Sequence, residues 1–248
     1  PYLKKRYFYI VSRQEETRST RFKFKNKGDL ILLYLISLIM LLISIIQFLI
    51  ITIDIIKNHQ SMAIMNIVWP LTGLYFPILG IIAYYKLGKE KQNNATHHSH
   101  NKPFWQSVII STTHCSAGCS LGNIIGAPIV FLTGLILFNN ELATTMIIEF
   151  ILAYIFGLMF QYFHMEIKHE NPIKDLKNAI KTDTLSLIAF EVGMFGFIII
   201  AHLTIKNNLL EPNKIEYWFI MQIAMLIGFF TSYPINWYLV KKGIKHAM

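Results

Sequence analysis

The sequence predicts an all-α integral membrane protein: a bundle of six transmembrane helices, the third of which is long, tilted or broken. Three observations support this fold class. Hydrophobic residues make up 54% of the 248-residue chain and charged residues only 15%, a balance typical of membrane proteins. Residues 30–53 and 62–85 each run for 24 residues without a charge, and about 20 apolar residues suffice to cross a bilayer. Finally, the basic residues alternate between the two predicted sides.

The predicted spans follow one another with short connections and cover residues 30–53, 62–85, 105–138, 142–164, 185–205 and 217–240. As a single helix, the third span would be about 51 Å long at ~1.5 Å per residue, which exceeds the ~30 Å hydrocarbon core. We therefore expect it to tilt, to break or to extend into water. Apolar side chains at helical spacing in residues 173–182 predict a separate short helix on the membrane surface.

Lysine and arginine predict the orientation. Segment 1–29 holds nine of them, the 86–104 loop four, the 165–184 loop four and the C-terminal tail three, whereas the predicted opposite side holds three. Because cytoplasmic loops are enriched in Lys and Arg, six spans place both termini in the cytoplasm. The net charge of +9 therefore reflects topology, and the basic N-terminal segment is too short to form a nucleic-acid-binding domain.

The same pattern divides the chain into four parts. Residues 1–29 form a basic cytoplasmic segment and residues 30–85 a two-helix part. Residues 86–104 form a cytoplasmic loop that contains histidines, and residues 105–248 a four-helix unit.

The third span contains the stretch TTHCSAGCSLG, which holds the only two cysteines of the chain, Cys115 and Cys119, next to His114. Residues four apart share one face of a helix, so the thiols lie one above the other. Cys115 lies about 15 Å from the expected interface at Trp105, near the bilayer midplane. Thiolates select soft ions such as Cu(I) or Zn(II). His114 could add a nitrogen ligand, although it lies about 100° round the helix from Cys115.

Three glycines at four-residue spacing, Gly118, Gly122 and Gly126, form a second stripe on the same span. Small residues at this spacing let another helix approach closely. We therefore expect these glycines to pack against a neighbouring helix.

We expect other polar side chains inside the membrane to line an ion pathway or to surround the ligands of the cysteine motif. Glu149 and Glu191 lie within spans four and five, where ionisable residues are costly and usually functional. Met194 shares a helix face with Glu191. His164 and His202 lie near span ends. Each also has a structural interpretation, as a protonated Glu bonded to a neighbouring helix, a packed Met or a helix-end His.

Four segments resemble a bacterial membrane-protein family known only as a domain of unknown function, DUF4396. They are THCSAGCSLGNII, FQYF at 160–163, DTLSLIAFEVGMFGF at 183–197 and YPINWYLVKKGIKHAM at 233–248. In the family's pattern, glycine stands at the position of Ser116 and an acidic residue at that of Asn123. The resemblance covers roughly residues 104–248, groups these segments into one unit and implies the inner membrane of a bacterium, but it implies no activity.

The sequence thus predicts a membrane protein that binds or translocates a soft transition-metal ion through His114, Cys115 and Cys119. Cu(I) is the preferred ion, with zinc and haem as weaker candidates. One alternative is a thiol–disulfide oxidoreductase that uses the same cysteines, and another is an accessory or assembly subunit whose motif serves packing alone. No nucleotide-binding, G-x-S-x-G or H-E-x-x-H motif is present in the sequence, which favours a protein that is not an enzyme. The expected partners are the lipid bilayer, the metal ion and either a second copy or a metal-delivery protein, and not nucleic acid.

Overall fold

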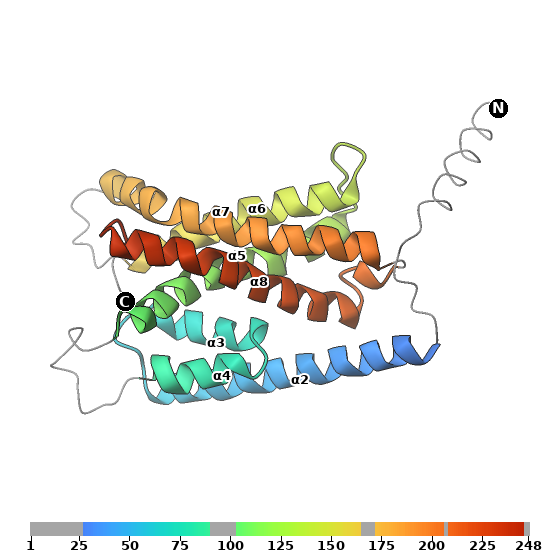
Figure 1. Cartoon of the computed structure of the whole chain (residues 1–248), viewed down its shortest axis with the longest axis horizontal. Helices are drawn as coiled ribbons and strands as arrows, with labels where there is room; N and C mark the ends of the chain where they lie inside the picture. Colours follow the sequence, from blue (N-terminus) through green and yellow to red (C-terminus); the bar gives the residue numbers. More distant parts are fainter. Residues whose placement is uncertain (1–26, 90–102, 165–171, 206–207, 246–248) are drawn as a thin grey trace.

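The computed structural model describes residues 27–89, 103–164, 172–205 and 208–245. These residues form helices and no strands. Five helices are long and apolar enough to cross a membrane, and they lie side by side along the long axis of the molecule (Figure 1). They are α2 (Lys27–Lys57), α5 (Phe104–Thr133), α6 (Glu141–His164), α7 (Pro172–Thr204) and α8 (Ile215–Lys241).

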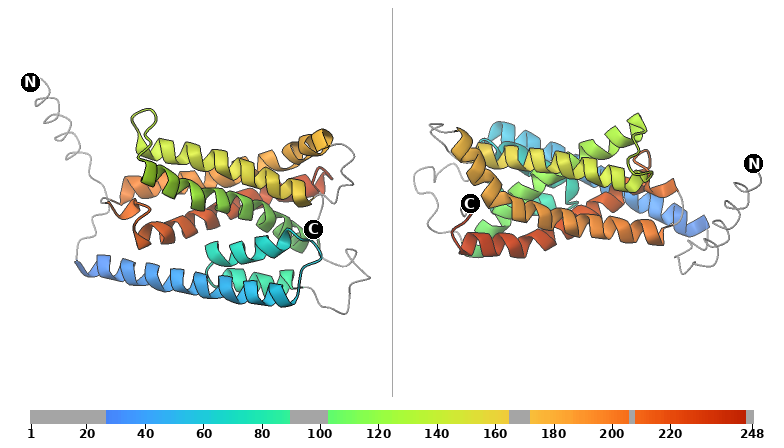
Figure 2. Two further views of the ribbon diagram at one scale, coloured as in Figure 1. Left: turned by 180° about the vertical axis from the view of Figure 1, so that it is seen from behind. Right: turned by 90° about the horizontal axis from the view of Figure 1, so that it is seen from above.

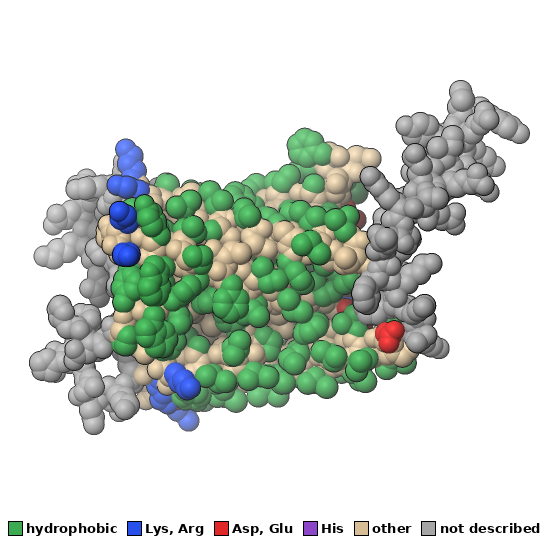
Figure 3. Space-filling model, in the orientation of Figure 1, with side chains coloured by type: hydrophobic (Ala, Val, Ile, Leu, Met, Phe, Trp, Pro, Cys, Tyr) green, Lys and Arg blue, Asp and Glu red, His purple; other side chains and the backbone are tan. Residues whose placement is uncertain are grey.

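The surface of this bundle matches a protein surrounded by lipid. Hydrophobic side chains cover the middle of the face seen in Figure 3, and the Lys and Arg side chains of the described residues gather near one end. Many large apolar side chains are exposed, among them Leu32, Ile46, Val192 and Phe230. Such an apolar belt is costly in water and favourable in a bilayer, so the chain is a membrane protein.

The predicted second span, residues 62–85, is not one helix. It consists of α3 (Met65–Tyr75), α4 (Leu79–Ala83) and the π-helix η1 (Tyr84–Gly88). Both views in Figure 2, together with Figure 1, show α3 entering the bundle and α4 returning to the same end. Five of the described helices are therefore long and apolar enough to cross a membrane, and residues 65–88 form a helical hairpin that reaches only part of the way along the bundle.

Local sequence explains the break. Phe76 precedes Pro77, and a residue before proline is driven out of the helical conformation; its ψ is 82°. Ile78 has a φ of +66°, which turns the chain back. The two arms then approach closely, because a Cβ on Gly80 would lie 2.7 Å from the Thr72 carbonyl oxygen.

Two glutamines satisfy the open backbone at the hairpin tip. Gln47 of α2 donates to the carbonyl oxygens of Gly73 and Phe76, the latter at 2.7 Å, and accepts from the Ile78 amide at 3.1 Å. Gln222 of α8 donates to the Leu74 carbonyl oxygen at 2.9 Å. Non-helical backbone at membrane depth is tolerated only where protein or water provides such partners.

The hairpin bears on the predicted topology. Helix α2 begins at one end of the bundle, whereas α8 ends at the other (Figure 1). The placement of both termini on the cytoplasmic side was based on an even number of crossings and stays a prediction, because both chain ends lie outside the described residues. Most of the predicted segment 1–29 and of the loop 86–104 lies outside the described residues.

The remaining helices differ from the predicted spans mainly at their ends. Helix α5 is continuous for 30 residues and ends at Thr133, five residues before the predicted end, with Gly134 as its C-cap at a φ of +63°. The expected surface helix at 173–182 is instead the first part of α7, which continues without interruption to Thr204.

Candidate functional site

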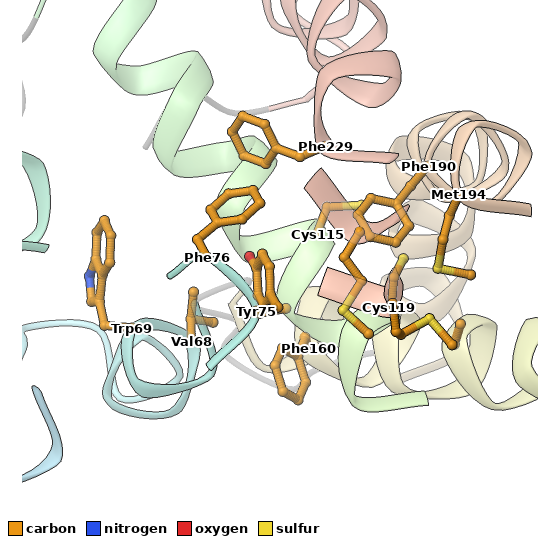
Figure 4. Packing of buried hydrophobic residues seen from close by; sticks show 14 of the residues in the cluster. Val68, Trp69, Tyr75, Phe76, Cys115, Cys119, Phe160, Phe190, Met194 and Phe229 are labelled. Carbon is orange, nitrogen blue, oxygen red and sulfur yellow. The ribbon is translucent and has the colours of Figure 1, made fainter. Parts of the chain in front are cut away.

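The cysteine motif lies in the middle of α5, in the interior of the bundle. Cys115 and Cys119 are both fully buried and unbridged. The helix is unbroken between them, so the two thiols lie one turn apart on a face that meets α7. In Figure 4 they lie in the same apolar cluster as Tyr75 of the hairpin and as Phe190 and Met194 of α7.

Polar side chains of α7 contact both thiols. The Ser186 hydroxyl donates to the Cys115 sulfur at 3.2 Å. Cys119 lies close enough to Cys115 and to the Glu191 carboxyl to interact with both. The two thiols therefore lie between a hydroxyl on one side and a carboxyl on the other.

Asn123, one turn beyond Cys119 on α5, extends this chain of contacts. Its amide nitrogen lies 3.0 Å from the Met194 sulfur and 3.5 Å from a Glu191 carboxyl oxygen. Asn123, Glu191 and Met194 are all buried. The structure thus brings the predicted residues Glu191 and Met194 next to the cysteine pair, with Asn123 as the link.

A second set of polar contacts leads from Cys115 to the end of the bundle where α8 ends. Asn236 of α8 donates to the Ser186 hydroxyl at 2.6 Å. Lys245, beyond the end of α8, donates to the side-chain amide oxygen (Oδ1) of Asn236 at 2.9 Å and forms an ion pair of 2.5 Å with Asp183. All four side chains are buried. We call the series Asp183–Lys245–Asn236–Ser186 the polar chain.

Sequence reasoning missed the polar chain, although part of its signal was present. Asp183, Ser186, Phe190 and Met194 recur at three- and four-residue spacing, which places them on one face of α7. The contribution of Lys245 depends on how the chain turns after α8, which no periodicity reveals.

His114 does not join the cysteines in a metal site. Its ring lies 6.1 Å from that of Phe160 on α6, centroid to centroid. Among the described residues, no group of three or more His, Cys, Asp or Glu side chains is arranged to hold a metal ion. The 100° between neighbouring helical positions separates His114 from the thiol face.

The three predicted packing glycines lie against α6. A Cβ on Gly118 would lie 2.7 Å from the Gly157 Cα, and one on Gly122 would lie 2.2 Å from the Ala153 amide nitrogen. One on Gly126 would lie 2.9 Å from the Glu149 side chain. The glycines thus allow α6 to approach one face of α5, while the cysteines face α7.

Glu149 and His202 line a cavity of about 450 Å³ at the opposite end of the bundle. Glu141 and Glu211 also line it. Glu149 is buried at its inner side, and the Tyr217 hydroxyl lies 3.5 Å from its carboxyl oxygen. His164 is the last residue of α6, and its side chain lies outside the described part of the chain, as do the histidines of the 86–104 loop.

The described interior therefore has an acidic cavity at one end, the two thiols in the middle and the polar chain at the other end. A family model, a domain of unknown function (DUF4396), matches residues 104–245, the part that forms α5 to α8 and carries all of these features. No curated protein and no solved structure is detectably similar to the chain. Since the match covers more than half of the sequence, the chain belongs to the DUF4396 family.

Proposed function

We propose that this protein binds Cu(I) at Cys115 and Cys119 and passes it across the membrane. The observation that carries the proposal is the pair of buried thiols one turn apart on an unbroken helix, in the same buried cluster as the sulfur of Met194. Thiolate and thioether ligands select Cu(I) over hard cations. Buried apolar surroundings alone do not require two cysteines and a methionine at the same depth.

The small number of ligands favours Cu(I) over Zn(II). Zinc in proteins takes four ligands in structural sites and three with an open position in catalytic sites. The described residues offer no cluster of three His, Cys, Asp or Glu side chains. Two thiols with one nearby thioether suit an ion that accepts few ligands and must also leave again. His114 is then an auxiliary residue and not a ligand in the resting arrangement.

The acidic cavity and the polar chain outline a route for the ion. A cation entering the cavity would reach Glu149 at its inner side and then Glu191 next to Cys119. Carboxylates along a membrane path are typical of cation routes. We assign the end of the bundle where α8 ends, which carries Lys57, Lys89 and Lys241, to the cytoplasm of a bacterial cell, as expected for the C-terminus. A metal-delivery protein or a second copy would then exchange the ion with this end.

The redox alternative requires a different helix. Positions i and i+4 of a helix have Cβ atoms about 5–6 Å apart, whereas a disulfide needs about 3.5–4.5 Å. Oxidation of Cys115 and Cys119 to a disulfide would therefore unwind α5, which is continuous through both residues.

An anaerobic titration tests the proposal. Purified protein in detergent competes with a Cu(I) chelator of known affinity, and each variant is compared with wild type. We expect Cys115→Ser and Cys119→Ser each to lose most of the affinity, Met194→Leu to lose less and His114→Ala least. Met221→Leu is the matched control, because Met221 is an equally buried methionine on α8 that lines an apolar crevice.

Two results would contradict the proposal. Equal Cu(I) affinity in wild type and in the double serine variant would leave the motif with a packing role alone, as in an accessory subunit. A stoichiometric Cys115–Cys119 disulfide in the protein as purified, opened reversibly by a reductant, would put the oxidoreductase in its place.

A further inference from the structure

Lys245 is buried at the C-terminal end of the bundle, which is unusual for a lysine. Only 2% of it is exposed. The chain reaches this position through Gly243, whose φ of +67° closes α8, and the Ile244 amide donates to the Leu239 carbonyl oxygen at 3.0 Å. The turn directs the Lys245 side chain back between α7 and α8.

The Lys245 ammonium is held by oxygen atoms. It lies 2.5 Å from an Asp183 carboxyl oxygen and 2.9 Å from the side-chain amide oxygen (Oδ1) of Asn236. The second Asp183 carboxyl oxygen is buried and has no hydrogen-bond partner. A carboxylate and an amide carbonyl are the ligands that hard cations prefer, and here a tethered cation occupies them.

Stability alone does not account for this ion pair. Burying two charges costs several kcal/mol per ion, and well-packed apolar residues often do as well or better. Burial by itself lowers the pKa of Lys245, but the charge and hydrogen bond of Asp183 together with the neighbouring Cys115 and Cys119 outweigh it and the pKa is raised, so the group remains a cation. It stands in series with Asn236, Ser186 and the Cys115 thiol.

We propose that Asp183 and Asn236 form a cation site that the Lys245 ammonium occupies as a built-in plug, closing this end of the route to Cys115. The role as a gate rests on the proposed function, whereas the cation site stands on its own contacts. A cation that leaves the thiols toward this end must displace the ammonium or wait until the C-terminal turn moves out.

The first experiment empties the site with Lys245→Ala. The probes are ammonium and methylammonium, with choline as a cation too large to enter, all at one ionic strength. Mass action stabilises a protein that binds a ligand only when folded, so we expect a saturable rise of several degrees in the melting temperature with the small cations. Wild type and Asp183→Asn/Lys245→Ala should show none. No rise in Lys245→Ala, or the same rise in the double variant, would overturn the cation site.

The second experiment measures the plug, in a Cys119→Ser background in which Cys115 is the only thiol. A small charged methanethiosulfonate is added to protein in detergent. Asp183→Asn/Lys245→Ala leaves no unpaired buried charge, so it remains testable if Lys245→Ala fails to fold. We expect it to react about tenfold faster than its parent, because the end is open without prior local unfolding. An unchanged rate would overturn the plug.

The outcomes separate this inference from the proposed function. A rise in the melting temperature of Lys245→Ala with small cations, without Cu(I) binding at the cysteines, would keep the cation site and reject copper as the cargo. Cu(I) binding with neither this rise nor faster reaction of Cys115 would keep copper as the cargo and reject the plug.

Discussion

The two parts of the molecule use polar side chains in the membrane in opposite ways. In the part formed by α2 and the hairpin, the Gln47 side chain hydrogen-bonds to backbone atoms. It satisfies the amide and carbonyl groups that the break at Phe76 to Ile78 exposes. In the part formed by α5 to α8 the long helices are unbroken. The polar side chains of the candidate site bond to one another and to Cys115 instead, whereas Gln222 of α8 bonds to the hairpin backbone. A polar residue inside the membrane therefore indicates a functional site only if its side chain is not needed to satisfy exposed backbone amide and carbonyl groups.

The share of buried residues also differs among the helices. Within the most apolar window of each helix, 61% of the residues of α5 are buried inside the structure but only 22% of those of α2 and of α6. Helix α5 is the central element of the bundle, while α2 lies at its edge and supports the hairpin (Figure 2). The candidate site therefore lies where the protein excludes most lipid.

The largest expected effect concerns which side of the membrane each connection occupies. In a Cys115→Ser/Cys119→Ser background, single cysteines are introduced by Asn58→Cys, Lys86→Cys and Asn139→Cys and labelled with an impermeant reagent in sealed vesicles. The hairpin places the first two on one side and the third on the other. If Asn58→Cys and Lys86→Cys label from opposite sides, residues 62–85 cross the membrane and the contrast between the two parts disappears.

The next effect tests close packing in the four-helix part. Gly122→Leu places atoms where a Cβ would already lie 2.2 Å from the Ala153 backbone. Overpacking a side-chain core costs about 1–3 kcal/mol, and backbone cannot move aside as a side chain can. We expect the yield of folded protein to fall sharply and the melting temperature of the remainder to drop. Gly196→Leu on α7 is the matched control, because nothing lies within 4 Å of a Cβ at that position. An equal loss of yield and melting temperature in both variants would contradict the close packing of α5 on α6.

A smaller and more local effect is expected in the N-terminal part. Gln47→Met keeps the length of the side chain but leaves the carbonyl groups of Gly73 and Phe76 and the amide of Ile78 without their partner. Each buried unsatisfied group costs about 1–3 kcal/mol. We expect faster hydrogen exchange in the hairpin with unchanged exchange in α5. Ser37→Ala is the control, since Ser37 bonds only to the Leu33 carbonyl oxygen of its own helix; faster exchange throughout would show that the two parts unfold together.

The smallest effect concerns Lys89, the exposed counterpart of Lys245. Its hydrogen bond to Asp54 raises the pKa of Lys89. A raised lysine pKa stabilises the folded state below the unfolded value of about 10.4 and the benefit is lost as pH rises through the folded value. The pair lies at the surface, where ion pairs contribute little, so Lys89→Gln should leave the melting temperature nearly unchanged at pH 7. A clear drop would show that the hairpin depends on this contact.

The sequence was sufficient for the helical class and for most span positions, because apolar length and charge alternation are properties of the chain itself. It also identified Cys115, Cys119, Glu191 and Met194, which the structure brings together. It failed at residues 62–85, where an uninterrupted apolar run concealed a hairpin. Hydropathy does not distinguish a full crossing from two half-crossings, and Pro77 with Gly80 was the signal that could have revealed the difference.

The polar chain could not be predicted for a different reason. Asn236 and Lys245 meet Asp183 only through the packing of α7 on α8 and the turn at Gly243. Nor could the side of α5 on which His114 falls be assigned from its neighbours in sequence. Such contacts between distant residues follow from tertiary packing.

The tip of the hairpin also sets an order on the maturation of the chain. Its Leu74 carbonyl is satisfied by Gln222, which belongs to α8, the described helix that is synthesised after all the others. Chains are made from the N-terminus at about 5–20 residues per second. Gln222 follows Leu74 by 148 residues, so the hairpin tip is synthesised well before its partner. Until then this carbonyl must find water or another partner, because lipid offers none. The N-terminal part is synthesised first but is completed last.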